Sequence, residues 1–430
     1  MKRRLASFFI AFALSPSLGF SQNPPKSPTE TALEAASVDD LSVVYEAAYF
    51  DQFQPVSVND MVSRIPGIGL ALGGGGGGGG RGLGGGAGEI LINGQRITGK
   101  SNEGRSQLSR ISADDVDYIE IIRGTSEEID VRGGGQVVNI VLRATESRSS
   151  IAAEISTDRM QDSKLAPGAR LSYSGQNGNL NYLFHIQSDP NYVNQVIRES
   201  SFDPEGVATE RRLEESTRDQ TNYETSVNLG YQFEKSMVQL NALYGQTAPP
   251  TDITRGIIGL AEDNPSVNLE REANQGRRDN WELGGDYEYS FDNRSKFRFL
   301  FIVNDRDFDF TRERFQVGSD EETKDLFLFS AARDRERIAR SSYTFNLLAG
   351  QAIETGVEIA QTIRDSEIRL GNDDEGGEPS AAHGGLFPVD VDNALSSVEE
   401  IRSEYFAIHN WQLTDAMSLE TALVYESSEI

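Results

Sequence analysis

The sequence predicts a mainly β protein in which a small α+β domain precedes an incomplete antiparallel transmembrane β-barrel. Three observations favour this fold. Short β-branched strands surround an Asn-Gly turn in the first 145 residues. After Arg143, apolar and polar residues alternate in runs of about ten residues, the length that a tilted membrane strand requires. Long charged stretches separate several of these runs.

The composition excludes several classes of function. The chain has 430 residues, which suggests two or more units, and a formal net charge of −27. An acidic balance of this size argues against nucleic acid as a partner. The chain has no cysteine, which excludes disulfides, thiolate metal sites and cysteine nucleophiles. Its three histidines are widely separated, so the sequence does not favour a zinc site either.

The N-terminus has the pattern of a targeting segment. Lys2, Arg3 and Arg4 precede the apolar residues 5–14, and small residues follow near position 21. This pattern predicts a signal peptide over residues 1–21, with an uncleaved anchor as the alternative. Residues 22–36 are rich in Pro, Ser and Thr and are expected to form a flexible linker.

Residues 37–145 carry the signals of a compact domain. Val58, Met61, Val62 and Ile65 recur at helical spacing, residues 57–60 form a capping box, and residues 66–67 are Pro-Gly, which ends a helix. Residues 90–92, 118–122 and 137–142 are apolar or β-branched and are expected to be strands. Asn93 and Gly94 predict a tight hairpin, because a type I′ turn needs positive φ at both central residues.

These segments together resemble the plug domain of the TonB-dependent outer-membrane receptors. The resemblance is carried, in the order and at the spacing of that family, by residues 60–68, 90–96, 119–124 and 137–141. The residues that match the family's plug motifs are Asn93, Gly94, Arg96, Arg123 and Gly124. Thr125 and residues 130–133 depart from the family's pattern, which puts a substrate assignment by analogy in doubt.

The resemblance implies a transporter with no catalytic residue, no cofactor and no metal site. Such a receptor takes up a scarce nutrient, such as a ferric siderophore, a corrinoid or an oligosaccharide. The implied partners are a TonB-type energy-transducing protein and the outer-membrane lipid of a Gram-negative bacterium. The plug would sit in the barrel lumen, with the N-terminus in the periplasm.

Residues 40–46 form a short β-prone patch between the linker and the domain. By resemblance, Leu41, Ser42, Val43 and Val44 occupy the position of the TonB box, which binds the partner by strand addition. The residues themselves allow a second interpretation, the first strand of the domain. They differ from the commoner Thr-Val-Val-Val pattern, and both interpretations stay open.

Residues 73–80 are an unbroken glycine run, followed by Arg81 and Gly82. Ordering such a run is costly in backbone entropy, so it is expected to be a mobile loop at the plug apex. Arg81 and Gly82 are candidate ligand-loop residues, because many relatives carry an Arg-Gly pair nearby. The alternative is a low-complexity expansion without function.

Residues 94–101 also match the P-loop pattern G-x-x-x-x-G-K-[ST], which would make Lys100 and Ser101 the centre of a nucleotide-binding enzyme. P-loop chemistry requires a helix that starts at the Lys-Ser end. The Asn93-Gly94 turn instead sends the chain back, and a polar, Gly-broken segment follows Ser101. We therefore expect a hairpin with a chance match.

Residues 146–430 are expected to form the N-terminal part of the barrel, with roughly ten to a dozen strands at about ten residues per strand plus loops. The alternating runs have aromatic ends, and residues 202–218, 247–279, 312–324 and 364–400 are expected to be long external loops. Because related barrels are about twice as large, we expect the sequence to be a fragment. A passive porin-like or adhesive barrel is the remaining alternative.

Overall fold

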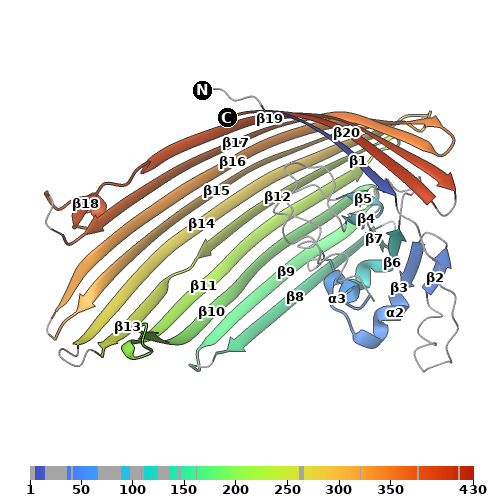
Figure 1. Ribbon diagram of the computed structural model, residues 1–430. Helices are drawn as coiled ribbons and strands as arrows, with labels where there is room; N and C mark the ends of the chain where they lie inside the picture. Colours follow the sequence, from blue (N-terminus) through green and yellow to red (C-terminus); the bar gives the residue numbers. More distant parts are fainter. Residues whose placement is uncertain are drawn as a thin grey trace.

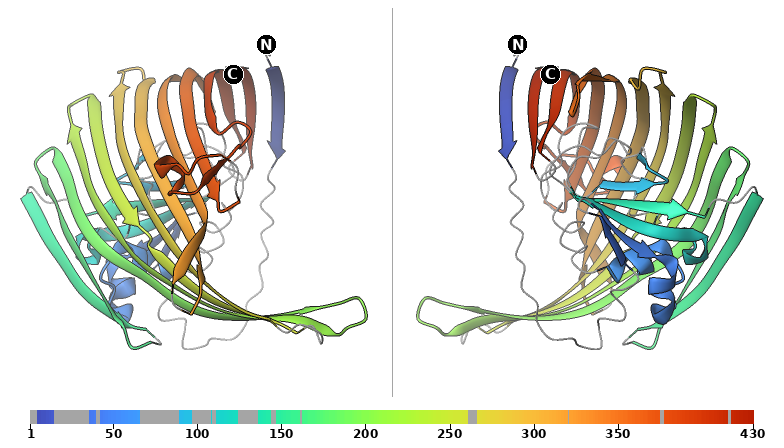
Figure 2. Two further views of the ribbon diagram at one scale, coloured as in Figure 1. Left: turned by 90° about the vertical axis from the view of Figure 1, so that its left-hand side faces the viewer. Right: turned by 90° about the vertical axis from the view of Figure 1, so that its right-hand side faces the viewer.

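The computed structural model describes residues 5–14, 36–39, 42–65, 89–96, 108, 111–123, 136–143, 147–160, 162–260, 266–319, 321–374, 377–414 and 417–430. These residues form a small N-terminal domain and a large curved sheet (Figure 1). The domain lies in the hollow of the sheet, near one of its edges (Figure 2). The predicted fold class, a small α+β domain followed by a large antiparallel sheet, is confirmed.

The N-terminal domain is a six-stranded sheet covered by short helices. Its strands have the order β2-β3-β6-β7-β4-β5, and β4 and β7 pair in parallel. Its elements are β2 (Ala36–Asp39), β3 (Ser42–Glu46), α2 (Ala47–Phe50), η1 (Asp51–Phe53), α3 (Val58–Ser63), β4 (Glu89–Ile92), β5 (Gln95–Arg96), η2 (Ala113–Asp115), β6 (Val116–Arg123) and β7 (Gln136–Leu142).

Local signals explain why these elements form where they do. The Ser57 side chain accepts a hydrogen bond from the backbone of Asp60, and the Asp60 carboxylate accepts from the backbone N–H of Ser57, so the predicted capping box is present. The apolar face of α3 is buried, with Val58 and Met61 at most 1% exposed. This face packs on Ile119, Val138 and other buried residues of the sheet, which together form the core of the domain.

The large sheet has 14 strands, in the main order β1-β20-β19-β17-β16-β15-β14-β12-β11-β10-β9-β8. Its elements are β1 (Leu5–Leu14), β8 (Ser147–Arg159), β9 (Leu165–Asn177), β10 (Leu180–Phe202), β11 (Ala208–Gln232), β12 (Ser236–Ala248), β13 (Thr251–Gly259), β14 (Ser266–Ser290), β15 (Lys296–Val317), β16 (Glu322–Leu348), β17 (Gln351–Asn372), η3 (Ala381–His383), β18 (Phe387–Val389), β19 (Leu395–Thr414) and β20 (Met417–Glu429). Within the described residues, the strand pairs of this sheet are antiparallel, as alternating strands joined by hairpins require.

The strand register separates two faces of this sheet. Leu183 of β10 belongs to the core of the N-terminal domain, and so marks the face that the domain contacts. A continuous row of paired residues carries the same face across the sheet: Leu183, Asn228, Asn241, Gly284, Ile302, Ile338, Ala360 and Arg402. We call this the inner face and the opposite one the outer face. Trp281, Tyr287 and Phe299 lie on the outer face and are 37–43% exposed.

The segments expected to be long loops are largely strand. β10 reaches Phe202 and β11 begins at Ala208, so strands occupy most of the expected loop 202–218. β13 and β14 occupy most of the expected loop 247–279. The reason is that the charged residues of these segments pair across neighbouring strands, as the Arg255 guanidinium does with the carboxylates of Glu214 and Glu270, at 2.7 and 2.9 Å. Charge alone therefore does not predict a loop when the opposite charge stands on the next strand.

The first described segment, β1, pairs with β20 along the edge of the large sheet. The expected signal peptide over residues 1–21 and linker over 22–36 stay predictions, although Ala36 belongs to β2. In the described part of the chain, no helix is long and apolar enough to cross a membrane.

Candidate functional site

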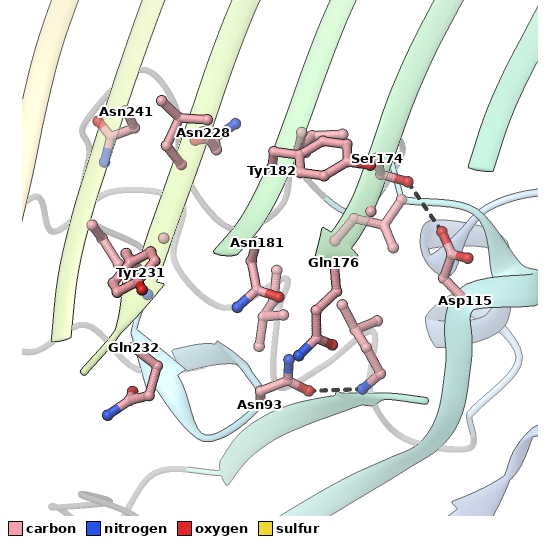
Figure 3. Close-up of a pocket in the computed structure, with 18 of the residues that line it drawn as sticks. Asn93, Asp115, Ser174, Gln176, Asn181, Tyr182, Asn228, Tyr231, Gln232 and Asn241 are labelled. Atoms are coloured by element: carbon pink, nitrogen blue, oxygen red, sulfur yellow. Dashed lines mark hydrogen bonds between the residues drawn. The ribbon is translucent and has the colours of Figure 1, made fainter. Parts of the chain in front are cut away.

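The candidate site is the contact between the N-terminal domain and the inner face of the large sheet (Figure 3). Leu183 of β10 is 7% exposed because it packs into the core of the domain. Next to it, the Ser174 hydroxyl of β9 donates a hydrogen bond of 3.0 Å to the Asp115 carboxylate of η2. One apolar anchor and one polar bond thus join the domain to the sheet at this point.

The Asn93-Gly94 turn faces this contact and has the conformation that the sequence predicts. Its φ angles are 52° at Asn93 and 76° at Gly94, and the chain returns antiparallel as β5. The Asn93 side-chain oxygen accepts a hydrogen bond of 2.8 Å from the Leu142 backbone N–H. The Asn93 backbone N–H donates to the Ile140 carbonyl at 2.8 Å. The turn is therefore attached to β7 as well as to its own hairpin.

Asn139 holds the turn from inside the domain, and sequence reasoning did not single it out. Its side chain belongs to a residue only 2% exposed. The side-chain oxygen accepts a hydrogen bond of 2.8 Å from the Gly94 N–H, and the amide nitrogen donates to the Glu120 carboxylate at 3.2 Å. A lone amide within an otherwise apolar strand was the available signal, because a buried polar group needs partners.

A cavity of about 160 Å³ lies between the turn and the sheet. The domain contributes Ile92, Asn93, Asp115 and Arg143 to its wall. Most of the polar residues that line it from the sheet are uncharged amides and phenols: Gln176, Asn181, Tyr182, Asn228, Tyr231, Gln232, Gln239 and Asn241. A cavity of this size and polarity can hold several water molecules. Water and amides exchange hydrogen bonds readily, so water can replace the hydrogen bonds that line this cavity.

Burial and nearby carboxylates favour the neutral form of the Tyr118 phenol. Burial raises the pKa of Tyr118 on β6, and the carboxylates of Glu120, Asp117 and Glu46 raise it further. Among the described residues, no group of three carboxylates or imidazoles is placed to hold a metal ion.

The candidate TonB box lies within the domain sheet. Leu41 is outside the described residues, whereas Ser42, Val43 and Val44 belong to β3. Val43 pairs with Val38 of β2 on one side and with Ile121 of β6 on the other. The structure thus has a domain strand at this position, one of the two interpretations that the sequence left open, and the partner-binding role stays a prediction.

Several predicted residues cannot be placed in the site. Arg96 ends β5 and Arg123 ends β6, and their side chains are outside the described residues. The same holds for the whole of these residues: Arg81, Gly82, Lys100, Ser101 and Gly124. The Glu120 carboxylate accepts a hydrogen bond from the Asn139 side chain. The hairpin at Gly94 is present, as expected if the P-loop match is a chance one.

Comparison with known proteins identifies the N-terminal domain. Residues 36–135 match the model of the TonB-dependent Receptor Plug Domain. No curated protein matches the chain. Among solved structures, the copper transporter OprC is similar at 13% identity and a TM-score of 0.33, over 91% of this chain and 63% of that one.

The ferric yersiniabactin uptake receptor FyuA from Yersinia pestis is similar at 11% identity and a TM-score of 0.31, over 88% of this chain and 63% of that one. The siderophore receptor PirA from Pseudomonas aeruginosa is similar at 11% identity and a TM-score of 0.25, over 91% of this chain and 99% of that one. The chain spans just under two thirds of the length of the first two, at 63% each. The match to a protein family covers the N-terminal domain, residues 36–135.

Proposed function

Because residues 36–135 are a TonB-dependent receptor plug domain, we propose that this protein takes up a scarce nutrient across the outer membrane. TonB-dependent receptors are transporters of the Gram-negative outer membrane and not enzymes. The observation that carries the proposal is the plug seated on the inner face of a large antiparallel sheet, with Leu183 of the sheet inside the plug core. The nutrients we propose are a ferric siderophore, a corrinoid or an oligosaccharide.

The outer face of the sheet supports a place in lipid. Leu240 of β12, Leu283 of β14, Phe299 of β15 and Ile359 of β17 are 39–53% exposed. The side chains that alternate with them on the inner face include Asn241 and Glu282, which are at most 5% exposed. Apolar residues outward and polar residues inward are the pattern of a transmembrane β-barrel wall.

The order of the plug sheet supports a route for the energy-transducing partner. β2 is the outermost strand, and within the described residues it pairs with β3 alone. Its four register pairs run from Ala36 with Tyr45 to Asp39 with Ser42. A partner strand can add to the free edge of β2, or replace β2 and bind Ser42, Val43 and Val44 directly. We infer that displacement of β2 makes the candidate TonB box accessible.

The test of this function is a binding and uptake experiment on strand variants. The periplasmic domain of the partner should bind the wild-type protein, and deletion of residues 40–45 should abolish both binding and energy-dependent uptake. A matched deletion of residues 203–206, in the loop between β10 and β11, should leave partner binding unchanged. Uptake that persists after deletion of residues 40–45 would contradict the proposal and favour a passive barrel.

A further inference from the structure

A distinct group of side chains lies on the inner face, toward the ends of the strands away from the short turns. Arg278 of β14, Phe308 of β15 and Ala332 of β16 are neighbours in one row of the register. This row lies six residues along each strand from the row of Leu183, Ile302 and Ile338, on the same face. At about 3.3 Å per residue, the two rows are about 20 Å apart.

Two phenylalanine rings lie parallel to one another in this region. The rings of Phe308 and Phe310 lie nearly parallel, with an interplanar angle of 11° and centroids 6.4 Å apart. Three of their four neighbours in the register are small: Ala332 stands on one side of Phe308, and Gly276 and Ser330 stand on either side of Phe310, while the fourth neighbour is Arg278. Small neighbours leave no long side chain to cover the rings from these positions.

Two arginines adjoin this surface without a carboxylate partner. The Arg278 guanidinium lies over the Phe308 ring, 5.0 Å from its centroid. Arg306 stands two residues before Phe308 on the same face, and it is exposed. Within the described residues neither arginine makes an ion pair. The register neighbour of Arg306, Asp334, instead pairs with Arg364 at 3.1 Å.

Other arginines of the inner face do have carboxylate partners. Arg255 binds three carboxylates there, and Arg402 binds the Glu358 carboxylate at 2.5 Å. The chain as a whole carries 67 acidic and 40 basic residues, so an arginine without an acidic partner is not due to a shortage of acids. Two such arginines beside a pair of stacked rings attract an anion from outside the chain.

We propose that Arg278, Arg306, Phe308 and Phe310 form a binding site for a planar aromatic anion. The ring pair offers a stacking surface, and a guanidinium forms paired, charge-assisted hydrogen bonds with a carboxylate or a similar planar oxyanion. The proposal rests on the proposed transport function and names its substrate class. A neutral oligosaccharide would leave both guanidinium charges uncompensated.

The experiment is a fluorescence titration of the full chain in detergent with naphthoate, a planar aromatic anion. Two control ligands separate the contributions: naphthamide has the same rings without the charge, and cyclohexanecarboxylate has the charge without the aromatic plane. We expect naphthoate to bind more tightly than either, and its binding to weaken as salt is raised. Phe308→Ala and Arg306→Gln should each weaken naphthoate binding by about tenfold.

Matched variants test the position of the site. Phe299→Ala on β15 and Arg337→Gln on the neighbouring strand β16 change the same residue types on the outer face, and they should leave naphthoate binding unchanged. A wild-type protein that binds naphthoate no more tightly than the two control ligands would overturn the site. So would Phe308→Ala and Arg306→Gln variants that bind naphthoate as tightly as Phe299→Ala and Arg337→Gln do. Partner binding by the wild-type protein is measured separately, so a wild-type protein that does not bind the partner would contradict the transport function and not this site.

Discussion

Asn139 provides the sharpest test of how the plug domain is held together, through the variant Asn139→Leu. Leucine has a similar volume but can neither accept from the Gly94 N–H nor donate to the Glu120 carboxylate, at 2.8 and 3.2 Å in the wild type. The Gly94 N–H would lose the partner that fixes the turn. The Glu120 carboxylate would lose a donor in a half-buried position.

The expected cost follows from these two losses. A buried polar group left without its partner costs about 1–3 kcal/mol, and more when the group is charged. Glu120 is partly solvated, so the loss there is at the low end, and leucine recovers some free energy because the site is apolar. We therefore expect Asn139→Leu to lower the free energy of opening of the domain by about 2–4 kcal/mol.

Hydrogen exchange of the full chain measures this directly. Backbone amides of β4 and β7 should exchange about 30- to 1,000-fold faster in Asn139→Leu, because 1.4 kcal/mol corresponds to a factor of ten. Asn139→Asp keeps the acceptor for Gly94 but puts a second negative charge beside Glu120, so it should be less stable at neutral pH than at acidic pH. Asn59→Leu, on the exposed side of α3, is the matched control.

The reasoning fails if Asn139→Leu exchanges as slowly as Asn59→Leu. That result would mean that packing of the apolar residues around β7 holds the turn without the amide. Faster exchange confined to β5 would also contradict it, since the Asn139 bonds join the Asn93-Gly94 turn to β6 and β7.

Three further predictions concern the cap, the plug contact and the inner-face charges. Asp60→Ala removes the acceptor of the Ser57 and Val56 N–H groups and should destabilise the domain by about 0.5–2 kcal/mol, measured by urea unfolding against Asn59→Ala. Leu183→Ala should cost about 2 kcal/mol and make the plug more sensitive to protease, whereas Leu283→Ala on the outer face should not. Glu272→Gln should cost about 3–5 kcal/mol in a thermal unfolding assay, because Glu272 is 1% exposed and pairs with Arg255 and Arg312. In the same assay, Glu322→Gln should cost under about 1 kcal/mol, because its pair with Arg271 is exposed.

The domain elements could be predicted from the sequence because their signals are local. The capping box at Ser57 and Asp60, the helical spacing of Val58 and Met61, and the positive-φ turn at Asn93 each depend on residues within about seven positions. A hydrogen bond or steric requirement at this range acts whatever the rest of the chain does. The strand positions followed for the same reason, since β-branched residues mark them directly.

The role of Asn139 could not be predicted, because it depends on which strands are neighbours. Gly94 and Asn139 are 45 residues apart, and they meet only because β4 pairs in parallel with β7. The sequence showed two apolar strands and left their pairing open. The position of β3 between β2 and β6 is of the same kind, because its Val-Val sequence suits both a domain strand and a partner-binding segment.

The segments wrongly expected to be loops show a second limit. Their composition favours a loop, whereas the pairing of their charges across strands favours a strand. Segments rich in Arg, Asp and Glu are usually solvated loops, yet β13, β14 and β15 continue through them. The Glu272 carboxylate is held by Arg255 from one neighbouring strand and by Arg312 from the other, at 3.0 and 2.6 Å. Where such a network satisfies every charge, the strand gains stability by continuing. Within the described residues, Arg278 and Arg306 on the same face make no ion pair, and they adjoin the parallel rings of Phe308 and Phe310, which is why we propose them as binding residues.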